Sequence, residues 1–324
     1  MSSEADGLLH LSSADVEACQ LSPAEIMAAV EEAFQEAAHG TAEMRPALSL
    51  PAGGGASFRA KAGVLRNAGF GAVKWYGYYP QNIAAGLAEY RPLILLNEAT
   101  SGFPVALIDG ELITTLRTAA ISAVAAKWLA RPVSARLGLI GLGTQARAHL
   151  SALRALFPIA SVIAHGRRPE TVAAFCDFAR AEGMAEVQVA EDPRAALAEA
   201  DIVITTVPRL SPNTGFLDAG WLSPGAFVSM VDSGVSWNSA TLGHFSQVFS
   251  DDVAQSRGHV EAGDASTSFA AGLADVVGGM HAGRRDARER IGLLFSGAGL
   301  ADAAAAVLVY RRALSRGIGR VLPR

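Results

Sequence analysis

The stretch ARLGLIGLGTQARAHL at residues 135–150 constrains the fold more than any other part of the sequence. An apolar run typical of a buried strand leads into the pattern Gly-x-Gly-x-x-Ala, and a helical segment follows. Gly141 permits the tight turn after the strand, Gly143 lets the backbone approach a pyrophosphate, and Ala146 permits close packing of helix on strand. The helix N-terminus offers N–H groups and the positive end of its dipole to an anion. This context predicts a dinucleotide-binding loop, and the alternative is a glycine turn of purely structural use.

Strand-like and helix-like segments alternate after residue 135. The expected strands are RLGLIG, SVIAHG, EVQVA, DIVITTV, AFVSMV and QVFSD, and helical or turn segments such as PETVAAFCDFARAEG and PRAALAEA separate the first five. Such alternation is typical of βαβ units on a parallel sheet. We therefore expect an α/β chain with a doubly wound Rossmann sheet.

The segments on either side of this region have another character. Residues 21–40 predict a helix that begins with the N-cap Ser22 and its capping-box partner Glu25. Short strand-like runs between residues 41 and 110 predict a mostly antiparallel sheet, and apolar helices are expected at 112–130 and 299–317. We expect a discontinuous α+β domain for substrate binding and dimerisation, residues 1–130 plus 298–324, with the Rossmann domain, residues 131–297, inserted into it.

Composition excludes several classes of partner. The formal net charge of −4 comes from interspersed charges, without a basic stripe, so neither nucleic acid nor a membrane surface is the expected partner. We expect no membrane span and, from the acidic first twenty residues, no secretion signal. Cys19 and Cys176 lie far apart and form no metal or redox motif. A cytoplasmic protein without a metal site is expected.

The end of the second expected strand indicates which dinucleotide is preferred. NAD-binding sites usually place an acid there for the ribose 2′-hydroxyl, whereas this chain has Gly166, Arg167 and Arg168 in IAHGRRPE. Two guanidinium groups suit a 2′-phosphate, which favours NADP(H) and leaves NAD(H) possible. The alternative is that both arginines are merely solvated.

Four blocks outside the glycine loop are more distinctive: MRP at 44–46, VKWYGYYPQN at 73–82, LILLNEATSGFPVALIDGELITTLRTAAISAVAAKWLA at 93–130 and GLADAAAAVLVY at 299–310. Together they resemble the ornithine cyclodeaminase/mu-crystallin family. The resemblance implies a homodimer whose front domains build a shared antiparallel β-barrel. It also implies one of two activities. One is reduction of imino acids or dehydrogenation of amino acids, and the other is cyclisation of ornithine with bound NAD as a recycled hydride carrier.

The same resemblance implies a carboxylate clamp of Arg45, Lys74 and Arg117, each inside a matched block. An α-imino or α-amino carboxylate needs a fork of donors to fix its plane, and Arg offers two parallel N–H bonds. Lys74 adds a point charge that also polarises the reacting centre. Taken singly, each of these residues would be an ordinary surface charge.

The family's acid follows the fifth Rossmann strand, where Asp232 in AFVSMVDSGVSW is the nearby carboxylate. Asp232 is expected to donate the proton to the imine nitrogen. However, it falls about two residues before the family position, which lies near Gly234, and the family's Pro-Gly-Lys is missing. The alternative is an acid that closes a loop.

Several further residues complete the expected site. Cofactor contacts are expected from the glycine loop and from the ends of neighbouring elements: Thr144, Gln145, Thr206, Val231 and Thr118. His149 and His165 lack a carboxylate partner or metal-ligand spacing, so structural roles are expected for both. The pair Asp251 and Asp252 is expected to contact backbone, and Asp302 in the C-terminal block is a further candidate near the nicotinamide.

The segment FRAKAGV at 58–64 bears on the substrate. Cyclodeaminases resemble one another in having an acid on this strand for the distal ammonium of ornithine, whereas this chain has Arg59 and Lys61. An uncharged or acidic substrate tail is therefore favoured. The leading hypothesis is an NAD(P)H-dependent reductase of a small imino acid, and the alternatives are a cyclodeaminase-type ammonia lyase and a non-catalytic NADPH-binding dimer.

Overall fold

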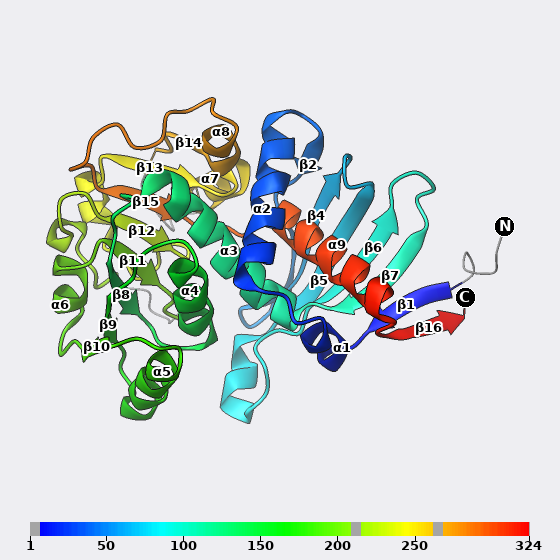
Figure 1. Ribbon diagram of the computed structural model, residues 1–324, viewed down its shortest axis with the longest axis horizontal. Coiled ribbons are helices and arrows are strands. Elements are labelled where there is room, and N and C mark those ends of the chain that lie inside the picture. The colour runs from blue at the N-terminus through cyan, green and yellow to red at the C-terminus, as the bar shows by residue number, and fades with distance from the viewer. Residues whose placement is uncertain (1–6, 209–214, 262–267, 324) are drawn as a thin grey trace. The chain divides into compact units, whose positions relative to one another are not determined.

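The computed structural model describes residues 7–208, 215–261 and 268–323 (Figure 1). The chain divides into two compact units, Met1–Arg117 with Ala298–Arg324, and Thr118–Gly297. The division falls inside helix α3 (Glu111–Leu129), whereas the boundary predicted from the sequence follows residue 130. The predicted fold class is confirmed, since a parallel α/β unit is inserted into a discontinuous unit with an antiparallel sheet.

The first unit is built on one eight-stranded sheet in the order β16-β1-β7-β6-β5-β4-β2, with β3 also paired to β4. Its strands are β1 (Gly7–Leu11), β2 (Ala42–Met44), β3 (Leu48–Gly53), β4 (Ala56–Leu65), β5 (Phe70–Tyr78), β6 (Leu93–Glu98), β7 (Pro104–Asp109) and β16 (Arg320–Pro323). The pair β1–β7 is parallel, and the other pairs are antiparallel.

Among the described residues, the helices that belong wholly to the first unit are α1 (Ser13–Ala18), α2 (Pro23–Ala38), the 3-10 helix η2 (Pro80–Ala85) and α9 (Gly299–Arg316). Helix α2 starts with the predicted capping box, in which the Ser22 hydroxyl accepts from the Glu25 N–H and the Glu25 carboxylate accepts from the Ser22 N–H. Both partners satisfy N–H groups that the first turn would otherwise leave open.

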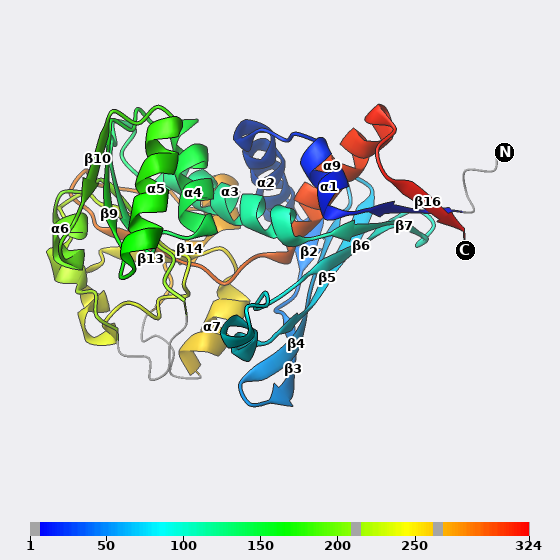
Figure 2. The ribbon, with the colours of Figure 1, turned by 90° about the horizontal axis from the view of Figure 1, so that it is seen from below.

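Helix α9 lies across the sheet and packs on β4 and β5, as Figure 2 shows. The contact is closest where two glycines meet. A Cβ atom on Gly299 would lie 2.3 Å from the Ala62 carbonyl oxygen, and one on Gly63 would lie 2.9 Å from the Gly299 carbonyl oxygen. Only residues without a side chain allow this approach of helix and strand. It brings the first turn of α9, with Asp302, against the sheet.

The second unit is a parallel sheet in the order β10-β9-β8-β11-β12-β15-β13-β14. Its strands are β8 (Arg136–Ile140), β9 (Ser161–His165), β10 (Glu186–Val189), β11 (Ile202–Thr205), β12 (Phe227–Met230), β13 (Gln247–Ser250), β14 (Ala271–Gly272) and β15 (Ile291–Leu294). The chain moves outward from β8 in one direction and then from β11 in the other. This reversal of strand order is the switch point at which doubly wound sheets bind ligands.

Helices cover both faces of this sheet (Figure 1). They are α4 (Thr144–Arg154), α5 (Pro169–Ala181), α6 (Pro193–Ala198), α7 (Val253–Glu261) and α8 (Leu273–Val277), together with the 3-10 helices η3 (Ala219–Trp221) and η4 (Ser239–His244). The six strands expected from the sequence all form. Strands β14 and β15 were not predicted from the sequence, and β15 inserts between β12 and β13.

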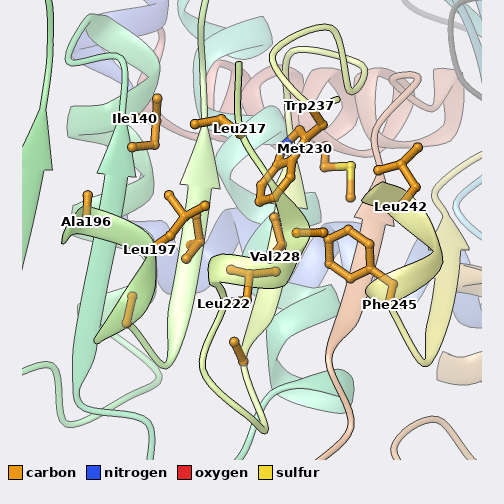
Figure 3. Packing of buried hydrophobic residues seen from close by; sticks show 14 of the residues in the cluster. Ile140, Ala196, Leu197, Leu217, Leu222, Val228, Met230, Trp237, Leu242 and Phe245 are labelled. Carbon is orange, nitrogen blue, oxygen red and sulfur yellow. The ribbon is translucent and has the colours of Figure 1, made fainter. Parts of the chain in front are cut away.

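A buried apolar cluster holds the carboxyl ends of the central strands in place (Figure 3). Ile140 and Met230, the last residues of β8 and β12, are 1% exposed within it. Trp237 meets Phe245 edge-on, with 5.7 Å between ring centroids. Because this cluster is packed, the loops that follow the strands start from fixed positions. No helix among the described residues is long and apolar enough to cross a bilayer.

Candidate functional site

The glycine loop joins the two central strands at the switch point. Gly141 has a φ of +85°, and a Cβ atom there would lie 2.8 Å from the Thr206 carbonyl oxygen. The Thr206 hydroxyl in turn donates to the Gly141 carbonyl at 3.0 Å. Thr206 and Gly141 directly follow β11 and β8, so these contacts fasten the two strand ends together. A side chain at position 141 would disrupt both.

The N-terminus of α4 is exposed and has no side-chain cap. Gly143 is the exposed N-cap, no side chain caps the helix, and a Cβ atom at this position would contact nothing within 4 Å. Thr144 is also exposed. The Oε1 atom of Gln145 is buried without a hydrogen-bond partner among the described residues. Uncapped N–H groups, an open backbone and an acceptor without a donor fit the pyrophosphate and the hydroxyl groups of a dinucleotide.

His149 links this loop to helix α3 through its two ring nitrogens. Its Nδ1 lies 2.7 Å from the Gln145 carbonyl oxygen and its Nε2 lies 2.9 Å from the Ser122 hydroxyl, which itself lies 2.8 Å from Ser229 Oγ. Burial lowers the pKa of His149 to about 4, so the ring is neutral. Since a carbonyl only accepts, Nδ1 carries the proton. These contacts agree with the structural role expected for His149.

The two arginines after β9 are solvent-exposed. Arg168 is the N-cap residue of α5, and its Nε lies 3.9 Å from the Glu170 carboxylate, with both side chains about three-quarters exposed. No carboxylate occupies positions 165–168 at the end of the strand. Because the ion pair between Arg168 and Glu170 is exposed, it contributes little to stability. A ligand could therefore bind Arg167 and Arg168. Of the other expected cofactor contacts, Val231 directly follows β12 and Thr118 is buried in α3.

Asp232 closes the loop that follows β12. One carboxylate oxygen accepts from the Thr205 hydroxyl and the Gly234 N–H, both at 3.1 Å, and the other accepts from the Ser236 hydroxyl at 2.6 Å. Burial raises the pKa of Asp232 to about 6, although these hydrogen bonds oppose the shift. The contacts match the loop-closing alternative from the sequence. The pKa still leaves the group able to exchange a proton near neutrality.

The first unit brings Lys74 and Arg117 together around Asp302. Asp302 Oδ1 lies 2.7 Å from Lys74 Nζ and 2.8 Å from Arg117 Nε, and Lys74 Nζ also lies 3.3 Å from the Thr114 hydroxyl. The Arg117 contact is an ion pair by distance, although its geometry is not that of a direct hydrogen bond. Relative exposures are 2% for Lys74, 4% for Arg117 and 1% for Asp302. Side chains from strand β5 and helix α3 thus converge on one buried carboxylate of helix α9.

The charges within this cluster determine its proton affinity. Burial and the Arg117 charge lower the pKa of Lys74 to about 7, although Asp302 opposes the change. Burial alone would raise the pKa of Asp302, but the charges of Arg117 and Lys74 outweigh it and hold that pKa below its usual value. Lys74 can therefore gain and lose a proton near neutral pH while Asp302 stays ionised.

Arg45 does not join the cluster. Its side chain is 82% exposed and contacts Glu43, with Nη2 and Oε1 2.6 Å apart. The structure therefore brings two of the three expected clamp residues together, and a substrate role for Arg45 stays a prediction. The buried Lys61 also acts on the cluster, because its charge lowers the pKa of both Lys74 and Asp302.

From the sequence, Asp302 was a candidate near the nicotinamide, and its pairing with Lys74 and Arg117 was not predicted. The available signal was an acid within an alanine-rich apolar helix, a position where a charge needs a buried partner. No group of three or more His, Cys, Asp or Glu suited to a metal ion occurs among the described residues.

Comparisons with known proteins agree with this architecture. The family model for the ornithine cyclodeaminase/mu-crystallin family matches residues 9–317. Alanine dehydrogenase of Archaeoglobus fulgidus is 34% identical over 306 residues, which are 91% of this chain and 92% of that protein.

Two of the solved structures that match nearly the whole chain are enzymes with a bound nicotinamide cofactor. Delta(1)-pyrroline-2-carboxylate reductase of Thermococcus litoralis, in complex with NADH and L-proline, has a TM-score of 0.85 at 28% identity and covers 97% of this chain and 99% of its own. Iminosuccinate reductase of Paracoccus denitrificans, in complex with NAD⁺, has a TM-score of 0.86 at 25% identity and covers 98% and 100%.

We predict that Asp302→Asn destabilises the protein by about 3–5 kcal/mol, because it leaves two buried cations without their counter-charge. The loss should have a part that does not vary with pH, from Arg117, and a part from Lys74. Lys74 is charged in the native state below its pKa of about 7 and neutral above it, so the second part should be present below pH 7 and vanish as the pH rises.

Urea unfolding of both proteins from pH 5.5 to 8.5 would measure this difference (roughly one pH unit and a half on either side of the Lys74 pKa). Asp177→Asn, which removes the exposed partner of Arg180, is the matched control and should change stability by about 0.5 kcal/mol or less. A loss for Asp302→Asn that matched the control would show that Asp302 is not the counter-ion of Lys74.

Proposed function

Because the chain belongs to the ornithine cyclodeaminase/mu-crystallin family, we propose that it is an NAD(P)H-dependent reductase of small imino acids. In reverse the same site would dehydrogenate the corresponding amino acid. The single observation that carries the proposal is the buried cluster of Lys74, Arg117 and Asp302 in a chain whose other unit has the dinucleotide loop. The names of the compared enzymes, which concern alanine, proline and iminosuccinate, support the same class of reaction.

Lys74 and Arg117 would hold the α-carboxylate of the substrate. Both are cations in a nearly water-free environment, where a hydrogen bond to a carboxylate is worth more than in water. Asp302 positions both cations through one oxygen atom. Arg45 would add a third cation if its side chain leaves Glu43 when substrate binds.

Reduction of the C=N bond needs a hydride at carbon and a proton at nitrogen. A bound dihydronicotinamide supplies the hydride, and residues of the glycine loop, with Thr206, Val231 and Thr118, would hold that cofactor. The proton would come from Lys74, whose pKa is about 7, or from Asp232, whose pKa is about 6. Either group is poised for acid–base work near neutrality.

The cyclodeaminase alternative is disfavoured by a specific observation. Lys61 lies directly opposite Lys74 in the β4–β5 pair, and Arg59 lies two positions along the same strand. The distal ammonium of ornithine would face like charges there. A non-catalytic binder is disfavoured because Lys74 and Arg117 are both buried at a cost that a mere nucleotide-binding protein would not need to meet.

We propose NADP(H) as the preferred cofactor, although the two compared structures contain NADH and NAD⁺. The support is the pair of exposed guanidinium groups, Arg167 and Arg168, at the end of β9, where NAD-preferring sites usually have an acid.

We further propose that the protein is a homodimer that uses the outer face of β3–β6. Large apolar side chains are exposed on this face: Leu48, Leu50, Phe58, Trp75 and Leu93. Phe58 and Trp75 stack with 5.8 Å between centroids and 7° between planes. A contiguous apolar patch on one sheet is typical of a surface that another chain covers, and a second copy agrees with the dimer that the family resemblance implies.

The reductase proposal predicts consumption of NADPH, at 340 nm, with pyrroline-2-carboxylate or with pyruvate plus ammonia. Arg117→Met should lower kcat/KM for the imine roughly 100-fold, because a charge-assisted bond to the carboxylate is lost. It should leave the Kd for NADPH within about twofold, as should the control Arg66→Met, whose side chain pairs with Glu43 at the surface. Absence of turnover on every imine, with tight NADPH binding, would refute the reductase.

The cofactor proposal predicts that wild-type protein prefers NADPH over NADH by roughly 100-fold in kcat/KM, since a 2′-phosphate gains two charge-assisted contacts. Replacing Arg167 and Arg168 together by Met should bring the ratio to within about tenfold through loss of NADPH affinity alone. Fluorescence titration of both cofactors would measure this loss of NADPH affinity. A wild-type preference for NADH would contradict the assignment.

The dimer proposal predicts that Trp75→Asp yields a monomer by light scattering at micromolar concentration, because a charge would be buried without a partner. Val133→Asp is the matched control, since Val133 is 77% exposed in a loop of the second unit. Unchanged mass for Trp75→Asp would mean that the partner uses another face.

A further inference from the structure

One face of the β4–β5 hairpin carries a row of cations. The register pairs Lys61 with Lys74 and Arg59 with Tyr76, so all four side chains project from the same face of the sheet. Lys61 is 9% exposed, Lys74 is 2% exposed, and Arg59 is half-buried. Like charges directly opposite each other across two strands destabilise a sheet, and burial adds to the cost. The ion pair with Asp302 offsets part of this cost for Lys74.

These side chains share one electrostatic environment with Arg117 and Asp302. The charge of Lys61 lowers the pKa of both Lys74 and Asp302, and the charge of Arg117 does the same. The charge of Arg59 acts on Tyr76. Among the described residues, Asp302 is the carboxylate that acts on Lys74, whereas Glu89 and Glu111 act on Tyr90, which meets Tyr76 edge-on. Three cations, Lys61, Lys74 and Arg117, thus act on one carboxylate, and Arg59 lies two positions from Lys61 on the same strand. With Lys74 protonated, a net positive charge remains after one substrate carboxylate has bound.

Two contacts fix the position of the Arg59 side chain. Its Nε donates to the Ser57 hydroxyl at 3.0 Å, and its guanidinium carbon lies 4.9 Å from the centroid of the Tyr78 ring. Tyr76 contacts a cation on each strand: Lys74 Nζ lies 5.7 Å from its ring centroid, and Arg59 forms a hydrogen bond with its side chain. A guanidinium fixed by a hydrogen bond and an aromatic face loses little entropy when it binds a carboxylate.

We propose that Arg59 and Lys61 form a second carboxylate subsite, so that the substrate is a dicarboxylic imino or amino acid of four or five carbons. The proposal rests on the proposed function, in which Lys74 and Arg117 take the α-carboxylate. Lys61 lies one cross-strand step from Lys74, about 5 Å between Cβ atoms, and Arg59 lies about 6.6 Å further along the strand. This spacing suits the two ends of a short dicarboxylate that lies along the hairpin.

The test compares each acid with its isosteric amide. With NADP⁺ or NAD⁺ and wild-type protein, kcat/KM for oxidation of L-aspartate or L-glutamate should exceed that for L-asparagine or L-glutamine at least roughly 100-fold. Lys61→Met and Arg59→Met should each reduce that ratio about tenfold or more, because the amide never used the charge. Both variants remove a charge and keep most of the side-chain volume, so the fold should tolerate them. Arg66→Met, just beyond the end of β4, is the matched control and should leave the ratio unchanged.

A binding measurement separates this inference from the proposed function. Succinate should bind wild-type protein at least about tenfold more tightly than butyrate, as measured by calorimetry, and Lys61→Met should remove the difference. If L-alanine or L-proline is oxidised but the acids are not favoured over their amides and succinate is not favoured over butyrate, the second subsite is refuted and the reductase stands. If no amino acid is oxidised but the succinate preference depends on Lys61, the subsite stands and the proposed redox function fails.

Discussion

The candidate site depends on one buried carboxylate. Asp302 faces Lys74 and Arg117 through the same oxygen atom, and none of the three side chains has much contact with water. Its position depends on the backbone contact of Gly299 with Ala62, because a helix held further from β4 would move its first turn away from the sheet. The two glycines at this contact, Gly299 and Gly63, therefore determine where the charge network forms. Burial of these charges lowers the stability of the protein, and such a loss is expected at a site where burial strengthens the recognition of an anion.

Local sequence pattern was sufficient to predict the elements around the glycine loop of the second unit. It was not sufficient to predict which strands pair over long distances in the sequence. The strand, turn and helix around Gly141 and Gly143 follow from residue type and spacing, and six strands form where alternation indicates them. Strand β15 was missed because its four residues, Ile291–Leu294, follow a run of charged residues and have no helical pattern beside them that would indicate a βαβ unit. Its place between β12 and β13 is decided by tertiary packing. In the same way, the division inside α3 cannot be found from a continuous helical sequence.

The family resemblance was sufficient to identify candidate residues of the site. It was not sufficient to predict which charged side chains form ion pairs with one another. Lys74 and Arg117 lie in matched blocks, and the structure brings them together. Arg45 lies in one too, yet its side chain pairs with Glu43 at the surface. The partners of Asp302 could not be identified from the sequence, since they come from β5 and α3, far away in the sequence. The opposition of Lys61 and Lys74 likewise becomes visible only once the hairpin register is known, because a shift of one residue would point them to opposite faces.

The same cations that would bind substrate also set the acidity of Lys74. Without ligand, burial, Arg117 and Lys61 keep the pKa of Lys74 at about 7, against the opposing charge of Asp302. An anion bound at Arg117 and Lys61 offsets their repulsion, so the pKa of Lys74 must rise on binding. Lys74 would then be protonated in the complex at neutral pH, when a proton is needed at the imine nitrogen. After reduction, the site returns to a state in which this proton is easily replaced from water. A surplus of positive charge thus couples recognition of the acid to the supply of the proton.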